Sequence, residues 1–157
     1  EPSWSGEEFS AVAQTKAPSV STNYSETGIT AEFPFYGNSP GIEQMQNGLP
    51  PETALFQATI REPHVGLGNG CLIRLSLPAQ IDDAAIATKL NQAEATGASN
   101  CHLLGAWYLE DNTLTFETFL PNTSHQAGLL SLLYQRSALR AHWAKGFLEE
   151  IGVTTGN

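Results

Sequence analysis

Residues 103–120, LLGAWYLEDNTLTFETFL, decide the fold class of this chain. Apolar and polar side chains alternate on both sides of the polar segment 110–113, a pattern typical of two antiparallel strands joined by a tight turn. Trp107 and Phe116 are placed to face the interior as an aromatic pair across the two strands. The segment therefore predicts a β-hairpin, which Pro121 and Asn122 close.

Beyond this hairpin the sequence predicts its longest element, a helix over roughly residues 127–151. One stripe of the helix carries Leu130, Leu133, Ser137, Ala141, Ala144 and Leu148. A second stripe carries Leu129, Leu132, Arg136, Arg140, Trp143 and Phe147. Two apolar stripes offer more apolar surface than one sheet face would cover, and the excess favours contact with a partner or with a second copy of the chain.

Helix and strand signals also precede the hairpin. Ser5 and Glu8 have the spacing of a capping box, and a short helix follows until Pro18. Alternating apolar residues then predict a hairpin over residues 19–35.

Two further strands and a helix follow. The alternation of side chains predicts strands over 56–61 and 72–77, and Pro78 is expected to end the second. Asp82-Asp83 can begin a helix that Gly97 ends. The predicted order is α-β-β-β-β-α-β-β-α, which favours an α+β fold with an antiparallel sheet of about five to six strands and helices packed on one face.

The length of 157 residues fits a single domain over residues 1–157. Residues 37–53 carry glycines and prolines without a period, so we expect a mobile loop. This loop is either a partner contact or a tolerated surface excursion.

Composition and charge limit the classes of partner. Hydrophobic residues make up 41% of the chain, and the formal net charge is −9 with a pI near 4.7. This sign is wrong for holding a phosphate backbone, so we expect neither nucleic acid nor an anionic membrane as partner. No apolar run is long enough to span a bilayer, and the first residues lack the pattern of a secretion signal.

Cys71 and Cys101 lie far apart and belong to no Cys-x-x-Cys pair. Two ordinary thiols in a reducing cytoplasm are the favoured interpretation, although a single disulfide is the alternative.

The segment 64–70, His-Val-Gly-Leu-Gly-Asn-Gly, is the strongest candidate for a nucleotide site. A phosphate loop requires a helix after its glycines, whereas this run leads into the strand that begins near Leu72. A wide turn that needs positive φ angles is the favoured interpretation.

No other pattern points to catalysis or to a cofactor. The four histidines, His64, His102, His125 and His142, form no local metal motif, and no serine has the surroundings of a nucleophile elbow. The adjacent carboxylates Glu110 and Asp111 are explained by a turn. We therefore expect no catalytic residue, no cofactor and no metal, although a site assembled only in three dimensions stays open.

The last helix holds the candidate partner-binding residues Arg136, Arg140, Trp143 and Phe147, which share one helical face. Arginine and tryptophan are enriched among the anchors of protein interfaces. The alternative is that Trp143 and Phe147 pack on the sheet while the arginines pair with acidic neighbours.

The segments 104–107 (L-G-A-W), 119–122 (F-L-P-N) and 140–143 (R-A-H-W) resemble bacterial proteins that share G-A-W, F-L-P-N and R-A-x-W patterns. In element order and acidity, the chain is similar to the YbjN and type III secretion chaperone-like group. That resemblance implies a small α+β protein that dimerises and binds protein segments without catalysis. It assigns no functional residue, because likeness of fold does not fix function.

The sequence thus predicts a cytoplasmic, non-catalytic protein-binding or chaperone-like adaptor whose partner is another protein or a second copy of itself. The alternative is an enzyme or regulator that binds a small molecule or nucleotide through residues 64–70.

Overall fold

The computed structural model describes residues 4–15, 21–35, 52–60, 66, 68–97, 105–126 and 128–153, and these form an α+β fold, as predicted. The elements in chain order are α1 (Gly6–Ala13), β1 (Ser21–Tyr24), β2 (Gly28–Pro34), β3 (Thr53–Ile60), β4 (Gly70–Gln80), α3 (Ala85–Ala95), β5 (Ala106–Glu110), β6 (Thr113–Pro121), the 3-10 turn η1 (Asn122–Ser124) and α4 (Leu129–Glu150).

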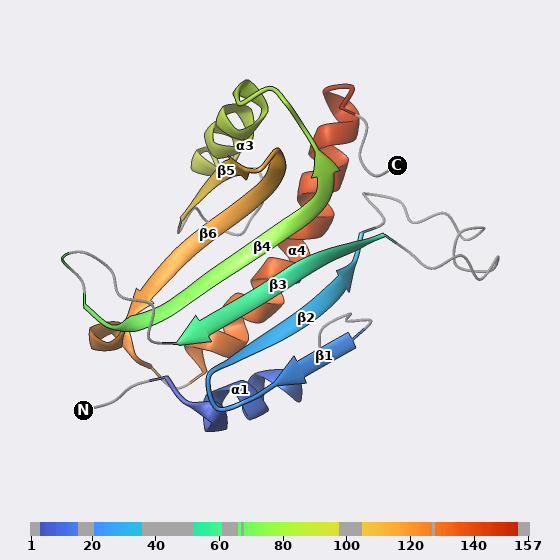
Figure 1. Ribbon diagram of the computed structural model, residues 1–157. Coiled ribbons are helices and arrows are strands. Elements are labelled where there is room, and N and C mark those ends of the chain that lie inside the picture. The colour runs from blue at the N-terminus through green and yellow to red at the C-terminus, as the bar shows by residue number, and fades with distance from the viewer. Residues whose placement is uncertain are drawn as a thin grey trace.

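The strands form one antiparallel sheet in the order β1-β2-β3-β4-β6-β5 (Figure 1). The chain leaves the sheet after β4, passes through α3 and returns as the β5–β6 hairpin, so β6 pairs with β4 and β5 forms an edge. The register aligns one row of buried side chains across five strands, namely Ala31, Phe56, Leu75, Phe116 and Trp107. The predicted inward pair of Trp107 and Phe116 is confirmed, with ring centroids 5.4 Å apart.

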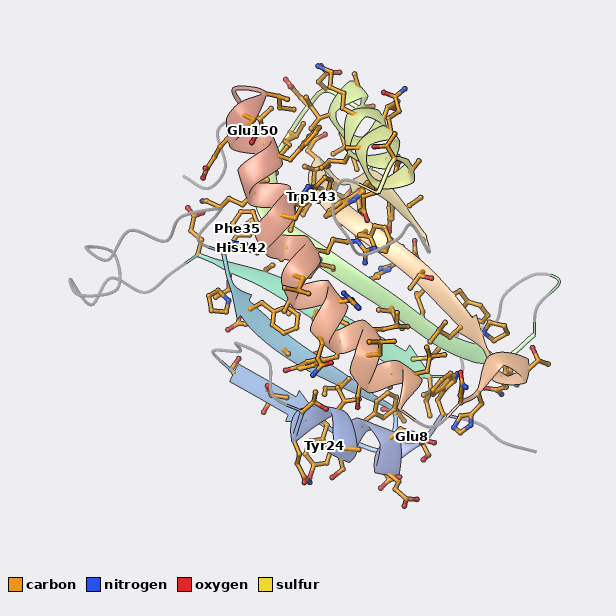
Figure 2. All side chains as sticks on the ribbon, turned by 180° about the vertical axis from the view of Figure 1, so that it is seen from behind. Glu8, Tyr24, Phe35, His142, Trp143 and Glu150 are labelled. Carbon is orange, nitrogen blue, oxygen red and sulfur yellow. The ribbon has the colours of Figure 1, made fainter. Side chains whose placement is uncertain are left out.

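The helices pack on one face of this sheet, as expected. Figure 1 shows α4 behind the strands, and Figure 2, seen from behind, shows it crossing in front of them with α1 and α3 to its two sides. The opposite face presents the neighbouring row, which includes Thr30, Gln57, Arg74 and Glu117, and no described helix covers it.

Tyr134 anchors α4 on the sheet. Its side chain is fully buried, and its ring meets those of Phe33 and Phe56 nearly edge-on, at 5.1 and 5.2 Å between centroids. Its hydroxyl lies 3.4 Å from the hydroxyl of Thr22 on β1. The phenol is therefore buried without losing its hydrogen bond.

The turn between β5 and β6 is the one that its sequence predicts. Asp111 and Asn112 have φ angles of 50° and 66°, the left-handed conformation that a two-residue hairpin loop requires at both positions. Asp and Asn tolerate this conformation better than most residues. Asp111 therefore lies in the turn, as predicted, and Glu110 is the last residue of β5 before it.

Pro78 does not end its strand, and that prediction is wrong. β4 continues to Gln80, and its register with β6 shifts between Ser76 and Gln80. Proline has no N–H group for the ladder, and a register shift is a place where a sheet can hold such a residue.

The helix starts agree with the sequence in part. Near the start of α3, the Asp83 carboxylate accepts a hydrogen bond from the Ala85 N–H at 3.0 Å, although Ala84 holds the N-cap position, and Gly97 follows the helix with a φ of 83°. At α1, however, Ser5 makes no side-chain cap. Its hydroxyl donates to the Glu8 carboxylate instead, so a complete capping box does not form.

Of the segment 37–53, only Glu52 and Thr53 belong to the described residues, so the predicted mobile loop lies almost entirely outside them. Thr53 begins β3, and the Glu52 carbonyl accepts a hydrogen bond from the Phe35 N–H at 2.8 Å. The Glu52 carboxylate pairs with Lys145 at 3.4 Å. These two residues belong to the packed structure rather than to a loop.

The β5 edge of the sheet is closed by a side chain of α3. Asn91 donates to the Trp107 carbonyl at 3.0 Å and accepts from the Trp107 N–H at 2.7 Å. The amide thus replaces a neighbouring strand at this position, and it hinders another chain from pairing there.

We predict that Asn91→Ala lowers the free energy of unfolding by about 1–3 kcal/mol, because both backbone groups of Trp107 lose their partner. Gln92→Ala, at the next and exposed position of α3, is the matched control and should stay within about 0.5 kcal/mol of the wild type. Chemical denaturation followed by circular dichroism measures both. Equal loss in the two variants would contradict the role of Asn91.

Candidate functional site

Arg140 does not belong to an exposed patch but pairs with an acidic neighbour, which is the alternative that the sequence left open. Only 4% of the residue is exposed, and its Nε lies 2.9 and 3.0 Å from the two carboxylate oxygens of Glu94, itself 1% exposed. The guanidinium also stacks over the Phe116 ring, 3.8 Å from its centroid. The indole N–H of Trp107 donates to the same carboxylate. This arrangement ties α4 to α3 and β5 and leaves Arg140 no access to a partner.

The other three predicted residues lie beside this cluster. Arg136, Trp143 and Phe147 are half-buried, and the two aromatic rings are 5.4 Å apart. Trp143 and Phe147 both pack against the core, and Figure 2 shows Trp143 on the side of α4 that faces α3. Of the four predicted residues, Arg140 is therefore buried, and the other three lie half-buried at the border of an exposed surface.

The exposed surface of α4 contains two leucines that the predicted patch lacks. Leu139 is 53% exposed and Leu132 is 45% exposed. With Arg136 and Trp143 they follow one another at spacings of four, three and four residues, so the four side chains share one side of the helix. We call Leu132, Arg136, Leu139 and Trp143 the outer face of α4. Leu139 was missed because it belongs to neither of the two apolar stripes, although it lies seven residues from Leu132.

The uncovered face of the sheet carries a charged cluster. Arg74 pairs with Glu117 across the β4–β6 ladder and with Glu110 on β5, both at 3.4 Å. Partial burial and the nearby charge of Glu117 raise the pKa of Tyr108 to about 12. At neutral pH the phenol is therefore protonated, and the arginine is held between two carboxylates.

His125 takes part in a contact that holds α1 in place. Its Nε2 lies 2.6 Å from a carboxylate oxygen of Glu8, and its ring lies 4.6 Å from that of Trp4. The Trp4 indole donates to the Leu120 carbonyl at 3.1 Å. His64 and His102 lie outside the described residues. Among the residues that are described, no group of three or more His, Cys, Asp and Glu side chains could hold a metal ion.

Cys71 is a buried free thiol, and burial raises its pKa to about 12. It therefore stays protonated at neutral pH and is a poor nucleophile. Cys101 lies outside the described residues, and the free state of Cys71 favours the interpretation as ordinary thiols over the disulfide alternative.

In the glycine-rich segment, the structure describes Gly66, Gly68, Asn69 and Gly70. Gly66 and Gly68 have positive φ angles of 96° and 74°, and Gly70 begins β4. A Cβ at Gly70 would collide with the Leu120 carbonyl oxygen, so this glycine serves close strand pairing. A strand follows the glycines, so the segment does not lead into the helix N-terminus that a phosphate loop requires.

We predict that Glu94→Gln lowers the free energy of unfolding by about 3 kcal/mol or more, because it leaves the buried charge of Arg140 without a counter-charge. The double variant Glu94→Gln with Arg140→Met should recover most of this loss, since it removes the buried charge and keeps an acceptor for the Trp107 indole N–H. Glu149→Gln, exposed near the end of α4, should change stability by less than about 0.5 kcal/mol. Thermal or chemical denaturation measures all three. A double variant no more stable than Glu94→Gln would show that the charge balance is not what matters.

The contact between Glu8 and His125 should make the stability of the fold depend on pH. Partial burial of the Glu8 carboxyl opposes its ionisation, but hydrogen bonds from Ser5 and His125 outweigh this effect and lower its pKa below the ordinary 4.5. Glu8 thus stabilises the fold above about pH 4.5, and this contribution disappears as the pH falls through the lowered pKa. Glu8→Gln should be less stable than the wild type at about pH 6, and the gap should close towards about pH 3. Glu7→Gln, at the exposed neighbouring position, is the control. A difference in stability between Glu8→Gln and the wild type that does not change with pH would contradict this role of the Glu8 carboxylate.

In the described part of the chain, no helix combines the length and apolarity needed to cross a membrane. No family model matches the chain, and no curated protein or solved structure is significantly similar to it.

Proposed function

We propose that this chain is a protein-binding, chaperone-like adaptor domain that docks a protein partner through the outer face of α4 and catalyses no reaction. The observation that carries the proposal is the exposure of Leu132 and Leu139 on one side of this helix. A helix on a sheet normally turns its apolar side to the sheet and a polar side to water. Here the side turned away from the sheet also carries large apolar side chains, next to the half-buried Trp143.

The state of the ionisable groups supports binding rather than catalysis. Cys71 and Tyr108 have pKa values raised to about 12, which makes both poor bases and poor nucleophiles at neutral pH. Arg74 and Arg140 are engaged with carboxylates. These four side chains are thus either protonated or paired with carboxylates within the fold.

The charge of the surface supports a protein partner over nucleic acid or an anionic membrane. The net charge is −9, and Arg74, Arg140 and Lys145 are each paired with a carboxylate inside the chain. The excess of negative charge would therefore repel the phosphate groups of nucleic acid or of an anionic membrane.

A cytoplasmic location is part of the same proposal. It is supported by the free thiol of Cys71, because free cysteines are typical of reducing compartments. The likeness in element order to the YbjN and type III secretion chaperone-like group points the same way, as an analogy of fold.

Immobilised wild type and two variants test the proposal. Leu139→Glu places a charge at the centre of the outer face, whereas Leu55→Glu changes a partly exposed leucine on the uncovered sheet face. We expect a native partner to bind the wild type and Leu55→Glu equally, and to bind Leu139→Glu at least about tenfold more weakly. All three proteins should stay folded under the binding conditions, and Leu55→Glu should show a small drop in denaturation midpoint, because position 55 lies opposite Glu32 in the β2–β3 register.

Binding that survives in Leu139→Glu would contradict the proposal. Selective loss in Leu55→Glu would contradict it as well, and would move the binding surface to the uncovered face of the sheet.

A further inference from the structure

We infer that the partner of α4 is a second copy of this chain, bound antiparallel about a two-fold axis that passes beside Trp143. The inference rests on the proposed function, and it adds the identity of the partner and the register of the two helices.

The spacing on α4 is that of a helix–helix seam. Leu132, Arg136, Leu139 and Trp143 alternate in steps of four, three and four, and Phe147 and Glu150 continue the steps with four and three. Helices that pack along their length repeat their contact residues about every 3.5 positions. The outer face of α4 therefore offers a continuous line of contact rather than an isolated apolar spot.

From Arg136 to Glu150, the order of residues along this line is self-complementary. In a two-fold interface, residue i of one copy meets residue j of the other, and j meets i in return. With Trp143 at the axis, Leu139 meets Phe147, since both lie four positions from Trp143. Arg136 meets Glu150, since both lie seven positions from it. Apolar side chains meet apolar ones, and a cation meets an anion, in both halves of the interface.

Other arrangements of two copies lose this agreement. A parallel pair would place Arg136 beside Arg136 and Glu150 beside Glu150, and like charges in contact are unfavourable. An antiparallel pair centred on Leu139 would place Gln135 opposite Trp143 and Leu132 opposite Gly146. Of these three arrangements, only the antiparallel pair centred on Trp143 matches both the apolar and the charged side chains.

The position of α4 in the fold permits this contact. Figure 2 shows α4 in front of the sheet, with the labelled Trp143 beside the upper half of the helix on the side towards α3 and Glu150 near the helix end. Glu150 and Leu139 are exposed, while Trp143 and Phe147 are half-buried against each other. Arg136 already has a contact within its own chain, so its contribution across the axis is that of a fixed positive charge near the partner's Glu150.

Analytical ultracentrifugation over a concentration series tests the inference. We expect the wild type and the control Leu55→Glu to dimerise with the same dissociation constant, and Leu139→Glu to raise that constant at least about tenfold. Circular dichroism and denaturation check that each variant keeps the fold.

A charge exchange tests the register. Arg136→Glu and Glu150→Arg should each weaken the dimer, because each brings two like charges together at both ends of the interface. The double variant should regain most of the lost affinity. In a parallel pair the double variant would gain nothing over either single one.

These experiments distinguish failure of the dimer inference from failure of the proposed function. A wild type that stays monomeric, but binds another protein in a manner that depends on Leu139, would overturn the inference and leave the proposed function standing. A dimer that Leu139→Glu leaves intact, together with partner binding that it leaves intact, would overturn both. A dimer that needs Leu139 but shows no recovery in the charge exchange would overturn the register centred on Trp143.

Discussion

The placement of α4 depends on the buried ion pair between Arg140 and Glu94. A buried charge without a partner is strongly unfavourable, so the two side chains must meet whenever α3 and α4 cover the sheet together. The same carboxylate accepts the indole N–H of Trp107, and the guanidinium lies over Phe116, which brings β5 and β6 into the cluster. One contact thereby fixes two helices and a hairpin relative to one another.

This fixed rotation of α4 decides which of its residues meet water. Tyr134 holds the first half of the helix on Phe33 and Phe56, and Arg140 holds the middle. With both inward, the side that carries Leu132 and Leu139 turns outward. The exposed leucines thus follow from the internal contacts of the helix. A surface fixed in this way is preorganised for docking, since little ordering is needed when a partner binds.

Internal pairing of cations also shapes the surface. The chain has seven basic side chains against sixteen acidic ones, and Arg74, Arg140 and Lys145 are bound to carboxylates within the fold. Negative charge therefore dominates outside, while the positive charge of Arg136 is placed beside the leucines of α4. Arg136 also has a contact within its own chain, and it borders the outer face of α4 as a fixed positive charge that can orient a partner.

The sequence by itself determined the elements that depend on local patterns. The alternation around residues 110–113 and the tolerance of Asp111 and Asn112 for positive φ fix the last hairpin within one short segment. The apolar spacing predicts α4 as a helix, but it does not show which of its two apolar stripes turns to the sheet or what an inward residue meets. Arg140 and Arg136 look alike in the sequence, and only the approach of Glu94, 46 positions away, buries one of them. The continuation of β4 past Pro78 and the exposure of Leu139 are tertiary facts of the same kind, because each depends on a neighbour that the chain brings near only when it is folded.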